Sequence, residues 1–279
     1  ALGFPSIPVP LGKTVGGTTT INSGTCFRAP RPLLDGWERD LGVAGVGGGA
    51  LDSYYEKVEE RLHVQPVKED LLGKNAELVR RGATALGLHS EPLRRAVNDN
   101  CRGCGVCCFG CPSDAKMSVN ISYIPAALER GLRLFTRCLA LRLLVENGHV
   151  AGVEAGFVRR TQDRPERRLT VRARTVVLAA GAIYSPLFLL SHRLGRASGQ
   201  VGHNLSLHPC SRVTALFDEP VEGWKGVPQG FCVDTLRDEG IMLEGIQGPP
   251  ALLGPLLPFS GRRYQELVEA APRLAAFGV

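Results

Sequence analysis

Five cysteines stand close together in the stretch CRGCGVCCFGCP, residues 101–112. Four of them, Cys101, Cys104, Cys107 and Cys111, follow the spacing C-x2-C-x2-C-x3-C and precede a proline, as in the iron–sulfur ligand runs of bacterial ferredoxins. Thiolates at these offsets can surround a cluster, and the glycines between them leave backbone N–H groups available to the sulfurs. The loop therefore predicts an iron–sulfur site that passes single electrons.

Three other interpretations of the cysteine loop stay open. Two-cluster ferredoxins draw a fourth ligand from a second cysteine run, which this sequence lacks, so either a remote ligand or all four ligands from this loop would be required. Zinc usually takes two separated ligand pairs, so it fits this single group less well. Without a metal, the loop is either a plain structural turn or the place of a disulfide formed on oxidation.

A second segment with chemical potential is GGTTTIN, which begins at Gly16 and Gly17. The two glycines let the backbone approach a ligand because no Cβ stands in the way. Thr18, Thr19 and Asn22 add short hydrogen-bonding side chains that suit a phosphate or the edge of a flavin. A glycine turn capped by threonines, with no ligand, is the alternative interpretation.

A third segment, AAGAIYSP, has the order strand, glycine, helix. The apolar run Val176–Ala180 predicts a buried parallel strand that ends at Gly181, and the pair Ser185 and Pro186 predicts the first turn of a helix. Such a turn presents backbone N–H groups and the positive end of the helix dipole to an anion. Many proteins use the same turn only for packing.

The remaining pattern predicts the elements that hold these segments. A capping box at Ser53 and Glu56 starts one helix, and Asn75 and Gly87 bound another. Apolar periodicity predicts helices over 51–62, 76–86 and 123–130. Asn147-Gly148 predicts a hairpin turn inside a strand pair over 132–158, a third strand follows at 169–173, and antiparallel strands follow at 212–217 and 241–244.

Composition limits the class of protein. The chain has 279 residues, 44% hydrophobic and 22% charged, which suits one large globular domain or two modest ones. No apolar run approaches the roughly 18 residues that cross a membrane. The net charge of +6 includes the arginine-rich stretch 159–169, but no aromatic residues interleave with it, which argues against nucleic-acid binding.

The nine cysteines and the two termini bear on the compartment. An odd number of cysteines argues against a secreted disulfide framework, and the scattered ones are expected to be buried thiols, namely Cys26, Cys138, Cys210 and Cys232. The chain opens without Met or a targeting pattern, so we expect both ends of a longer protein to be missing. A cytoplasmic and a periplasmic location therefore both stay open.

Several motifs together resemble one family, the glucose–methanol–choline (GMC) FAD-dependent oxidoreductases. GKTVGGTTTINSGTCFRAP is similar to its first hallmark, and GAIYSPLFLLS with SGQVGHNLSLHP is similar to its second. The resemblance covers residues 10–279 and is strongest to bacterial members with a CxxCGxCxxGCPxxAKxS loop, here 101–118. Cys26 and Phe188 depart from the usual residues. The chain is thus identified as an internal fragment of such a member.

The resemblance implies an α/β (α+β) fold. Part of a Rossmann-like FAD-binding domain with a β-meander would be joined to part of an antiparallel-sheet substrate domain. The implied divisions are FAD binding at 1–36, a helical insertion with the cysteine loop at 37–121, FAD binding at 122–205 and substrate binding at 206–279.

FAD is the implied cofactor, and its implied contacts fall in both glycine segments. They are Gly16, Gly17 and Thr18 near the pyrophosphate, Asn22, Ser23 and Thr25 near the flavin, and Ala140, Ala180 and Gly181 near the adenosine. No GxGxxG fingerprint is present. The implied pairing requires Gly17 and Gly181 to line one groove.

The implied reaction is oxidation of an alcohol carbon by hydride transfer to FAD. The family's catalytic base is expected beyond Val279, so no catalytic residue is assigned, and His208 belongs to a crossover motif rather than to the catalytic segment. We expect the fragment alone to be inactive. Sugars, sterols, choline and long-chain alcohols are all used in the family, so neither the substrate nor the electron acceptor is indicated.

Three alternatives to this function come from other classes. The chain is an iron–sulfur electron-transfer module centred on 101–111, a remnant that binds nothing, or a flavin hydroxylase or reductase. The last would need an NAD(P)H site, and the sequence has no second glycine-rich fingerprint for one.

Overall fold

The computed structural model describes residues 9–160, 164–208, 210–250, 254, 257 and 259–279. The chain divides into two compact units. Unit 1 joins Ala1–Leu132 to Cys210–Val279, and unit 2 is Arg133–Pro209. The arginine-rich stretch 159–169 includes three residues outside the described ones, 161–163.

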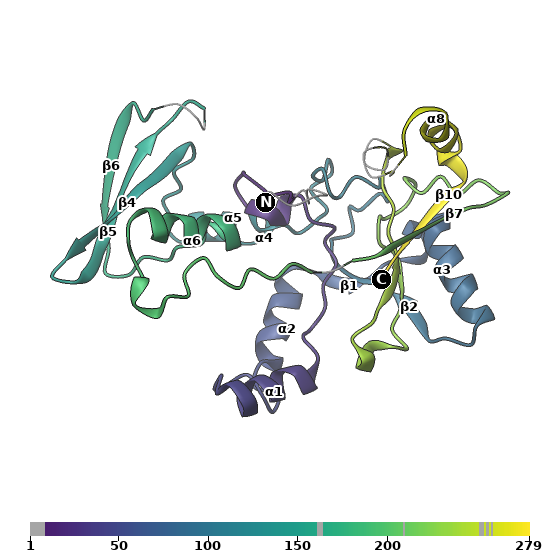
Figure 1. The fold of residues 1–279 in the computed structure, drawn as a ribbon, viewed down its shortest axis with the longest axis horizontal. Helices are drawn as coiled ribbons and strands as arrows, with labels where there is room; N and C mark the ends of the chain where they lie inside the picture. The colour runs from purple at the N-terminus through teal and green to yellow at the C-terminus, as the bar shows by residue number, and fades with distance from the viewer. Residues whose placement is uncertain (1–8, 161–163, 209, 251–253, 255–256, 258) are drawn as a thin grey trace. The chain divides into compact units, whose positions relative to one another are not determined.

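Unit 1 is built from helices and antiparallel strands (Figure 1). Its helices are α1 (Arg31–Leu41), α2 (Asp52–Arg61), α3 (Lys74–Ala85), α4 (Val119–Ser122), α5 (Ile124–Glu129) and α8 (Gly261–Glu269). Its strands are β1 (Val64–Pro66), β2 (Ser90–Pro92), β3 (Arg94–Ala96), β7 (Arg212–Leu216), β8 (Phe231–Val233), β9 (Leu243–Gly245) and β10 (Leu274–Gly278). Short 3-10 turns lie at Gly17–Thr20, Glu69–Leu71, Arg237–Glu239 and Ala271–Arg273.

The main sheet of unit 1 has five strands in the order β2-β8-β9-β10-β7, each antiparallel to its neighbours. The predicted antiparallel strands near 212 and 243 are therefore confirmed. A separate pair joins β1 to β3. The mixture of helices with antiparallel sheet agrees with the α+β prediction.

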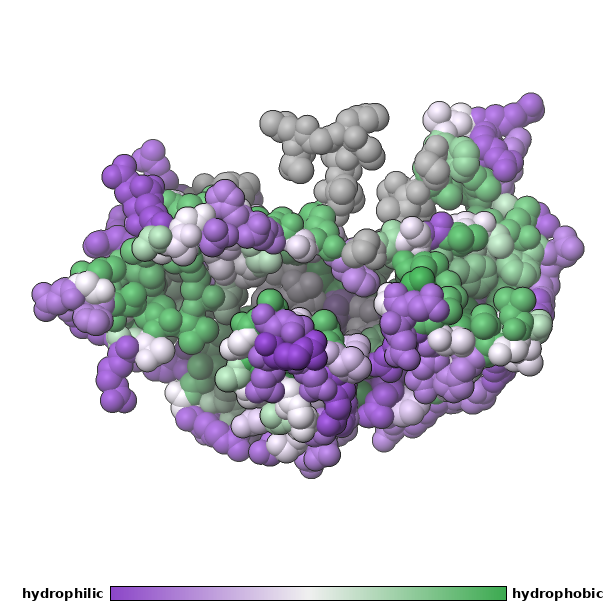
Figure 2. All heavy atoms as spheres, turned by 60° about the horizontal axis from the view of Figure 1, so that its bottom comes forward, coloured by the Kyte–Doolittle hydropathy of each residue, from purple (hydrophilic) through white to green (hydrophobic). Residues whose placement is uncertain are grey.

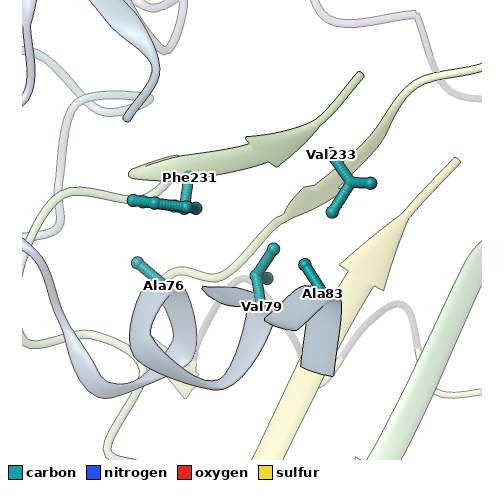
Figure 3. Packing of buried hydrophobic residues seen from close by; sticks show 5 residues of the cluster. All are labelled: Ala76, Val79, Ala83, Phe231 and Val233. Carbon is teal, nitrogen blue, oxygen red and sulfur yellow. The ribbon is translucent and has the colours of Figure 1, made fainter. Parts of the chain in front are cut away.

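Helix α3 covers one face of this sheet. Ala76, Val79 and Ala83 share one side of the helix at spacings of three and four residues, and they pack against Phe231 and Val233 of β8 (Figure 3). All five side chains are buried. This packing, rather than helix propensity alone, holds α3 in place.

The predicted helix ends are right in one place and wrong in two. Gly87 follows α3 with a left-handed φ of 66°, so the helix stops where predicted. Asn75 is not the N-cap, because Gly73 takes that position and the buried Asn75 amide donates to the carbonyl of Ala276 at 3.1 Å. The capping box at Ser53 is also absent, since the N-cap of α2 is Leu51 and no side chain caps it.

Unit 2 contains a three-stranded antiparallel meander, β4 (Cys138–Glu146), β5 (His149–Phe157) and β6 (Arg167–Arg172). Its hairpin turn at Asn147 and Gly148 has φ values of 51° and 80°, as a two-residue turn of primed type requires, so this prediction is confirmed. The Glu154 carboxyl of β5 accepts hydrogen bonds from Arg142 and Arg168. These bonds, chiefly the one from Arg142, hold the pKa of Glu154 below its usual value.

The strand predicted at Val176–Ala180 is wrong. These residues form no strand, and Val177 is 82% exposed. A strand exists through hydrogen bonds to a neighbour, and no segment in the described part of the chain pairs with this run. Helix α6 (Gly181–Ser191) then begins at Gly181, earlier than predicted, with Pro186 inside it. A 3-10 turn follows at Arg196–Ser198.

Apolar side chains are widely exposed. Figure 2 shows hydrophobic residues in green over broad areas of one face, between hydrophilic residues in purple. Such areas are typical of surfaces that contact a ligand or another part of a protein. None of the described helices is both long and apolar enough to cross a membrane.

Candidate functional site

The glycine loop, residues 16–25, begins with two left-handed glycines. Gly16 has φ 97°, and a Cβ there would lie 3.0 Å from the backbone nitrogen of Asn120 at the start of α4. Gly17 has φ 57°, and a Cβ there would meet nothing within 4 Å. Gly16 therefore permits close packing, whereas Gly17 leaves backbone open to a ligand.

The threonines of the loop hold its own backbone. Thr19 Oγ1 donates to the Gly16 carbonyl at 2.5 Å and accepts from the Val119 N–H at 3.1 Å. Thr20 Oγ1 donates to the Gly17 carbonyl at 2.8 Å. Thr18 Oγ1 accepts from the Gly12 N–H at 3.2 Å.

The residues predicted on the flavin side lie on the same loop. Asn22 Oδ1 accepts from the Gly24 N–H at 3.1 Å, and the hydroxyls of Ser23 and Thr25 are 3.4 Å apart. Thr25 Oγ1 also donates to Gln229 Oε1 at 3.0 Å, across more than 200 residues of sequence. The structure thus brings these predicted residues together, while their contact with FAD stays a prediction.

A buried lysine anchors the glycine loop. Lys116 is 4% exposed, and its Nζ donates to the carbonyls of Thr20, Asn22 and Cys107 at 2.9, 2.7 and 2.8 Å. Burial lowers the pKa of this ammonium group from its ordinary value, although neighbouring thiols act in the opposite direction. Three carbonyl acceptors satisfy its three donors without a carboxylate.

A buried arginine makes a second anchor. Arg95, on β3, is 3% exposed. Its guanidinium donates to the carbonyl of Ser23, to the carbonyl of Gln229 at 3.0 Å and to Cys107 Sγ at 3.2 Å. Arg95 and Lys116 therefore tie the glycine loop to the cysteine loop, and Arg95 also ties it to the segment before β8.

Sequence reasoning missed both anchors. Lys116 belongs to the AKxS end of the cysteine-loop motif. A lysine between the apolar residues Ala115 and Met117 is a signal that its charged group is buried with hydrogen-bond partners. Arg95 carries no such signal, because alternation on a three-residue strand is too short to show which face is buried.

The structure does not support the iron–sulfur prediction. Cys101, Cys104, Cys107 and Cys111 line one cavity, but its volume of about 20 Å³ is room for about one water molecule. In the part of the chain that is described, no three His, Cys, Asp or Glu side chains are arranged to hold a metal ion, which counts against zinc as well. All nine cysteines are free thiols, so no disulfide closes the loop in this structure.

The pKa values of two thiols in this loop, Cys107 and Cys111, are shifted in opposite directions. Burial raises the pKa of Cys107, although Arg95 and Lys116 act against it. Burial acts in the same direction on Cys111, but hydrogen bonds from the Lys116 N–H at 3.3 Å and from Ser113 outweigh it and lower the pKa of Cys111.

The predicted adenosine-side residues lie in unit 2. Ala140 pairs with Ala155 between β4 and β5. Ala180 precedes α6, and Gly181 has φ 85° with open space where a Cβ would stand, since no atom lies within 4 Å of that point. The first turn of α6 carries no acidic residue, so its N-terminus suits an anion. Gly17 belongs to unit 1, and a shared groove with Gly181 stays a prediction.

Both segments fit an anionic dinucleotide such as FAD. Residues 12–30 contain no Asp or Glu, and the buried cations Lys116 and Arg95 lie directly behind the loop. Open space at Gly17 and Gly181 allows main-chain contact with a ligand.

Comparison with known proteins supports this interpretation. Residues 5–210 match the family described as GMC oxidoreductase. The chain belongs to the GMC oxidoreductase family. The predicted family is therefore confirmed, which favours a flavin oxidoreductase over an iron–sulfur electron-transfer module.

Relatives extend beyond the present chain. An uncharacterized GMC-type oxidoreductase of Mycobacterium tuberculosis is 35% identical over 280 residues, which is 100% of this chain and 43% of the relative. A long-chain-alcohol oxidase of Arabidopsis thaliana is 27% identical over 220 residues, 77% of this chain and 29% of the relative. The chain thus spans less than half of these relatives.

A solved structure shares the fold. The crystal structure of pyridoxine 4-oxidase from Mesorbium loti aligns with a TM-score of 0.63, at 16% identity, over 96% of this chain and 56% of that one. The predicted GMC-type fold class is confirmed by this likeness.

Proposed function

We propose that this chain forms part of the FAD-binding region of an enzyme that oxidises an alcohol. Membership of the GMC oxidoreductase family supports the cofactor and the reaction class. The observation that carries the proposal is the pair of buried cations, Lys116 and Arg95. They donate to three carbonyls of the glycine loop, those of Thr20, Asn22 and Ser23. Because the loop is already fixed, its outward N–H groups and hydroxyls would bind FAD with little further loss of the loop's conformational entropy.

The chain's own residues would act by position and charge. Gly17 admits the ligand to the backbone, the threonines keep the loop closed on itself, and the cations offset the charge of a pyrophosphate. When bound, FAD would accept the hydride from the alcohol carbon. Cys107 takes a structural part here, because its carbonyl accepts a hydrogen bond from Lys116 and its thiol accepts one from Arg95.

Replacement of the lysine anchor tests the FAD site. We expect Lys116→Met to weaken FAD binding at least about tenfold, because each hydrogen bond to a charged group contributes about 1.5–3 kcal/mol and about 1.4 kcal/mol is tenfold. Lys116→Arg keeps the charge and should retain more FAD. Lys225→Met, at a 66% exposed side chain, is the matched control and should bind normally. The dissociation constant is measured by flavin fluorescence.

Two results would contradict the proposal. One is a folded Lys116→Met protein that binds FAD as tightly as the unaltered protein. The other concerns the reaction itself. Because this chain alone is expected to be inactive, the test uses the full-length enzyme that contains it: mixing that enzyme, loaded with FAD, with alcohols without oxygen should bleach the visible flavin absorbance. An enzyme that holds FAD but that no alcohol bleaches would not be an alcohol oxidoreductase.

A further inference from the structure

Side-chain hydrogen bonds connect the glycine loop to Glu244 on β9, and we call them the Glu244 network. Thr25 Oγ1 donates to Gln229 Oε1 at 3.0 Å, and Gln229 Nε2 donates to Glu244 Oε1 at 2.5 Å. Ser23 Oγ lies 3.4 Å from Thr25 Oγ1. The family resemblance assigns both of these hydroxyl residues to the flavin side, whereas Gln229 and Glu244 belong to neither glycine segment.

Strand geometry places the Glu244 side chain on the face of the sheet opposite α3. Leu243, the residue before it on β9, packs against the core that α3 makes with Val233. Successive side chains of a strand point to opposite faces, so Glu244 shares the other face with its cross-strand partner Cys232. The Glu244 network therefore joins the glycine loop to that face of the sheet.

The backbone already holds the glycine loop in place without this network. The Ala96 N–H of β3 donates to the Gly24 carbonyl at 2.8 Å. The Arg95 guanidinium donates to the backbone carbonyls of both Ser23 and Gln229. Attachment of the loop to the rest of unit 1 therefore does not depend on the Gln229 side chain.

The charge of Glu244 sets the direction of every hydrogen bond in the network. An ionised carboxylate can only accept, so the Gln229 amide turns its Nε2 toward Glu244 and its Oε1 toward Thr25. A threonine hydroxyl has one hydrogen, and Thr25 gives it to Gln229 Oε1. Toward any further group, including the Ser23 hydroxyl, Thr25 Oγ1 can therefore only accept. A Ser23 hydroxyl that donates to Thr25 is likewise left as an acceptor.

An acceptor at this end of the network matches one edge atom of a flavin. The ring of oxidised FAD has a single N–H donor, at N3, and its other polar edge atoms are acceptors. An acceptor facing an acceptor leaves both unpaired, which opposes binding. Thr25 and Ser23 are both only half-buried, so a ligand can reach this end of the network.

We propose that Gln229 and Glu244 are positioning residues of the FAD site, which fix the hydroxyls of Thr25 and Ser23 as hydrogen-bond acceptors for the flavin N3–H. The presence of a flavin at this loop rests on the proposed function above. Glu244 acts through Gln229 and does not itself touch the ring. Its effect is therefore a preference for a flavin that carries the N3 hydrogen.

The ratio of two dissociation constants tests this inference. The full-length enzyme that contains this chain is freed of FAD and titrated with FAD or with N3-methyl-FAD, which lacks the N–H, by flavin fluorescence. We expect the unaltered enzyme to prefer FAD at least about tenfold, which corresponds to about 1.4 kcal/mol. Because every variant meets the same methyl group, a change in the preference reports the hydrogen bond.

Three variants interrupt the network at different points. Thr25→Val keeps the shape of the side chain and removes the hydroxyl, and Gln229→Met keeps the length and removes the amide. Glu244→Gln keeps the shape but lets the Gln229 amide turn over. Each should lower the preference for FAD at least about threefold. Glu91→Gln is the matched control, because Glu91 lies opposite Cys232 on the other side from Glu244, outside the network.

The possible results separate this inference from the proposed function. Equal weakening of both flavins in Glu244→Gln and Gln229→Met would give the network a structural part alone and overturn the inference. A preference unchanged in all three variants, or an equal fall in Glu91→Gln, would also overturn it. If alcohols still bleach such an enzyme, the proposed function stands. If the preference falls as expected but no alcohol bleaches the enzyme, the network is supported and the alcohol reaction is contradicted. An enzyme that binds neither flavin contradicts both.

Discussion

The side chains that organise the candidate site act over long sequence separations. Lys116 reaches carbonyls 94 and 96 residues earlier in the chain, and Arg95 reaches Gln229, which is 134 residues later. Local patterns identified the glycine loop and its threonines, because a turn depends on neighbouring residues. Local patterns did not identify Lys116 and Arg95. A cation can be buried only where tertiary folding brings carbonyl acceptors to it, and local sequence does not show where that happens.

Differential alkylation tests the two thiols of the cysteine loop. The thiolate is the nucleophile, so a lowered pKa gives Cys111 more reactive thiolate at neutral pH, whereas Cys107 has less. We expect iodoacetamide to modify Cys111 several-fold faster than Cys107, with the rate at Cys111 reaching its plateau at a lower pH. Burial raises the pKa of Cys232 to about 12, so it is the matched slow control.

Peptide mass spectrometry after timed quenching measures these rates at each cysteine. Faster labelling of Cys107 than of Cys111 would contradict the arrangement of hydrogen bonds around Cys111. Labelling of Cys111, Cys107 and Cys232 at one common rate would show that unit 1 unfolds before it reacts, because Cys232 lies on β8 outside the loop.

At the element scale, one glycine joins the cysteine loop to helix α3. The Gly226 N–H donates to the Gly103 carbonyl at 2.8 Å, and a Cβ at Gly226 would lie 2.4 Å from the backbone nitrogen of Gly73, the N-cap of α3. Gly226 also has a left-handed φ of 90°. The left-handed φ and the close approach to Gly73 both oppose any residue with a Cβ at position 226.

Substitution of this glycine should destabilise unit 1. Gly226→Ala adds a backbone clash to the left-handed strain of about 1–2 kcal/mol, and overpacking contributes about 1–3 kcal/mol more. Gly240→Ala, at φ 79° with nothing within 4 Å of its Cβ, carries the strain alone and is the control. Urea unfolding should show a lower midpoint for Gly226→Ala than for Gly240→Ala. Equal midpoints would mean that the backbone at residue 226 moves away from the start of α3 without loss of stability, which would contradict the prediction.

Elements that depend on local sequence were predicted well, and elements that depend on partners were not. The Asn147-Gly148 turn and the end of α3 at Gly87 follow from backbone preference alone. The apolar run Val176–Ala180 has the composition of a buried strand, but composition does not supply the neighbour that a strand needs. Asn75 has the preference of a cap, yet the Ala276 carbonyl takes its amide.

At the scale of the whole molecule, the order of strands lies beyond local prediction. The sheet joins β2 to β8 with Ser90 opposite Val233, a pairing across 143 residues. Strands of three residues, such as β8 and β9, carry too little alternation to reveal their partners. The family resemblance anticipated an antiparallel sheet, while the register came only with the structure.

Hydrogen exchange over the whole chain tests this distribution of order. Strand β10 pairs on both sides, with β9 and β7, and Ala275 and Ala276 are almost fully buried, so its amides should exchange slowest in unit 1. In unit 2 the slowest amides should lie on β5, which pairs with β4 and β6.

Residues 176–180 should exchange at least about a hundredfold faster than β10 and β5. Their amides have no strand partner in the described chain, and about 2.7 kcal/mol of lost protection corresponds to a hundredfold. Mass spectrometry of peptides after timed deuteration measures the ratio. Protection of 176–180 equal to that of β5 would mean that this run finds a strand neighbour in solution, and the prediction of a buried strand there would then be right after all.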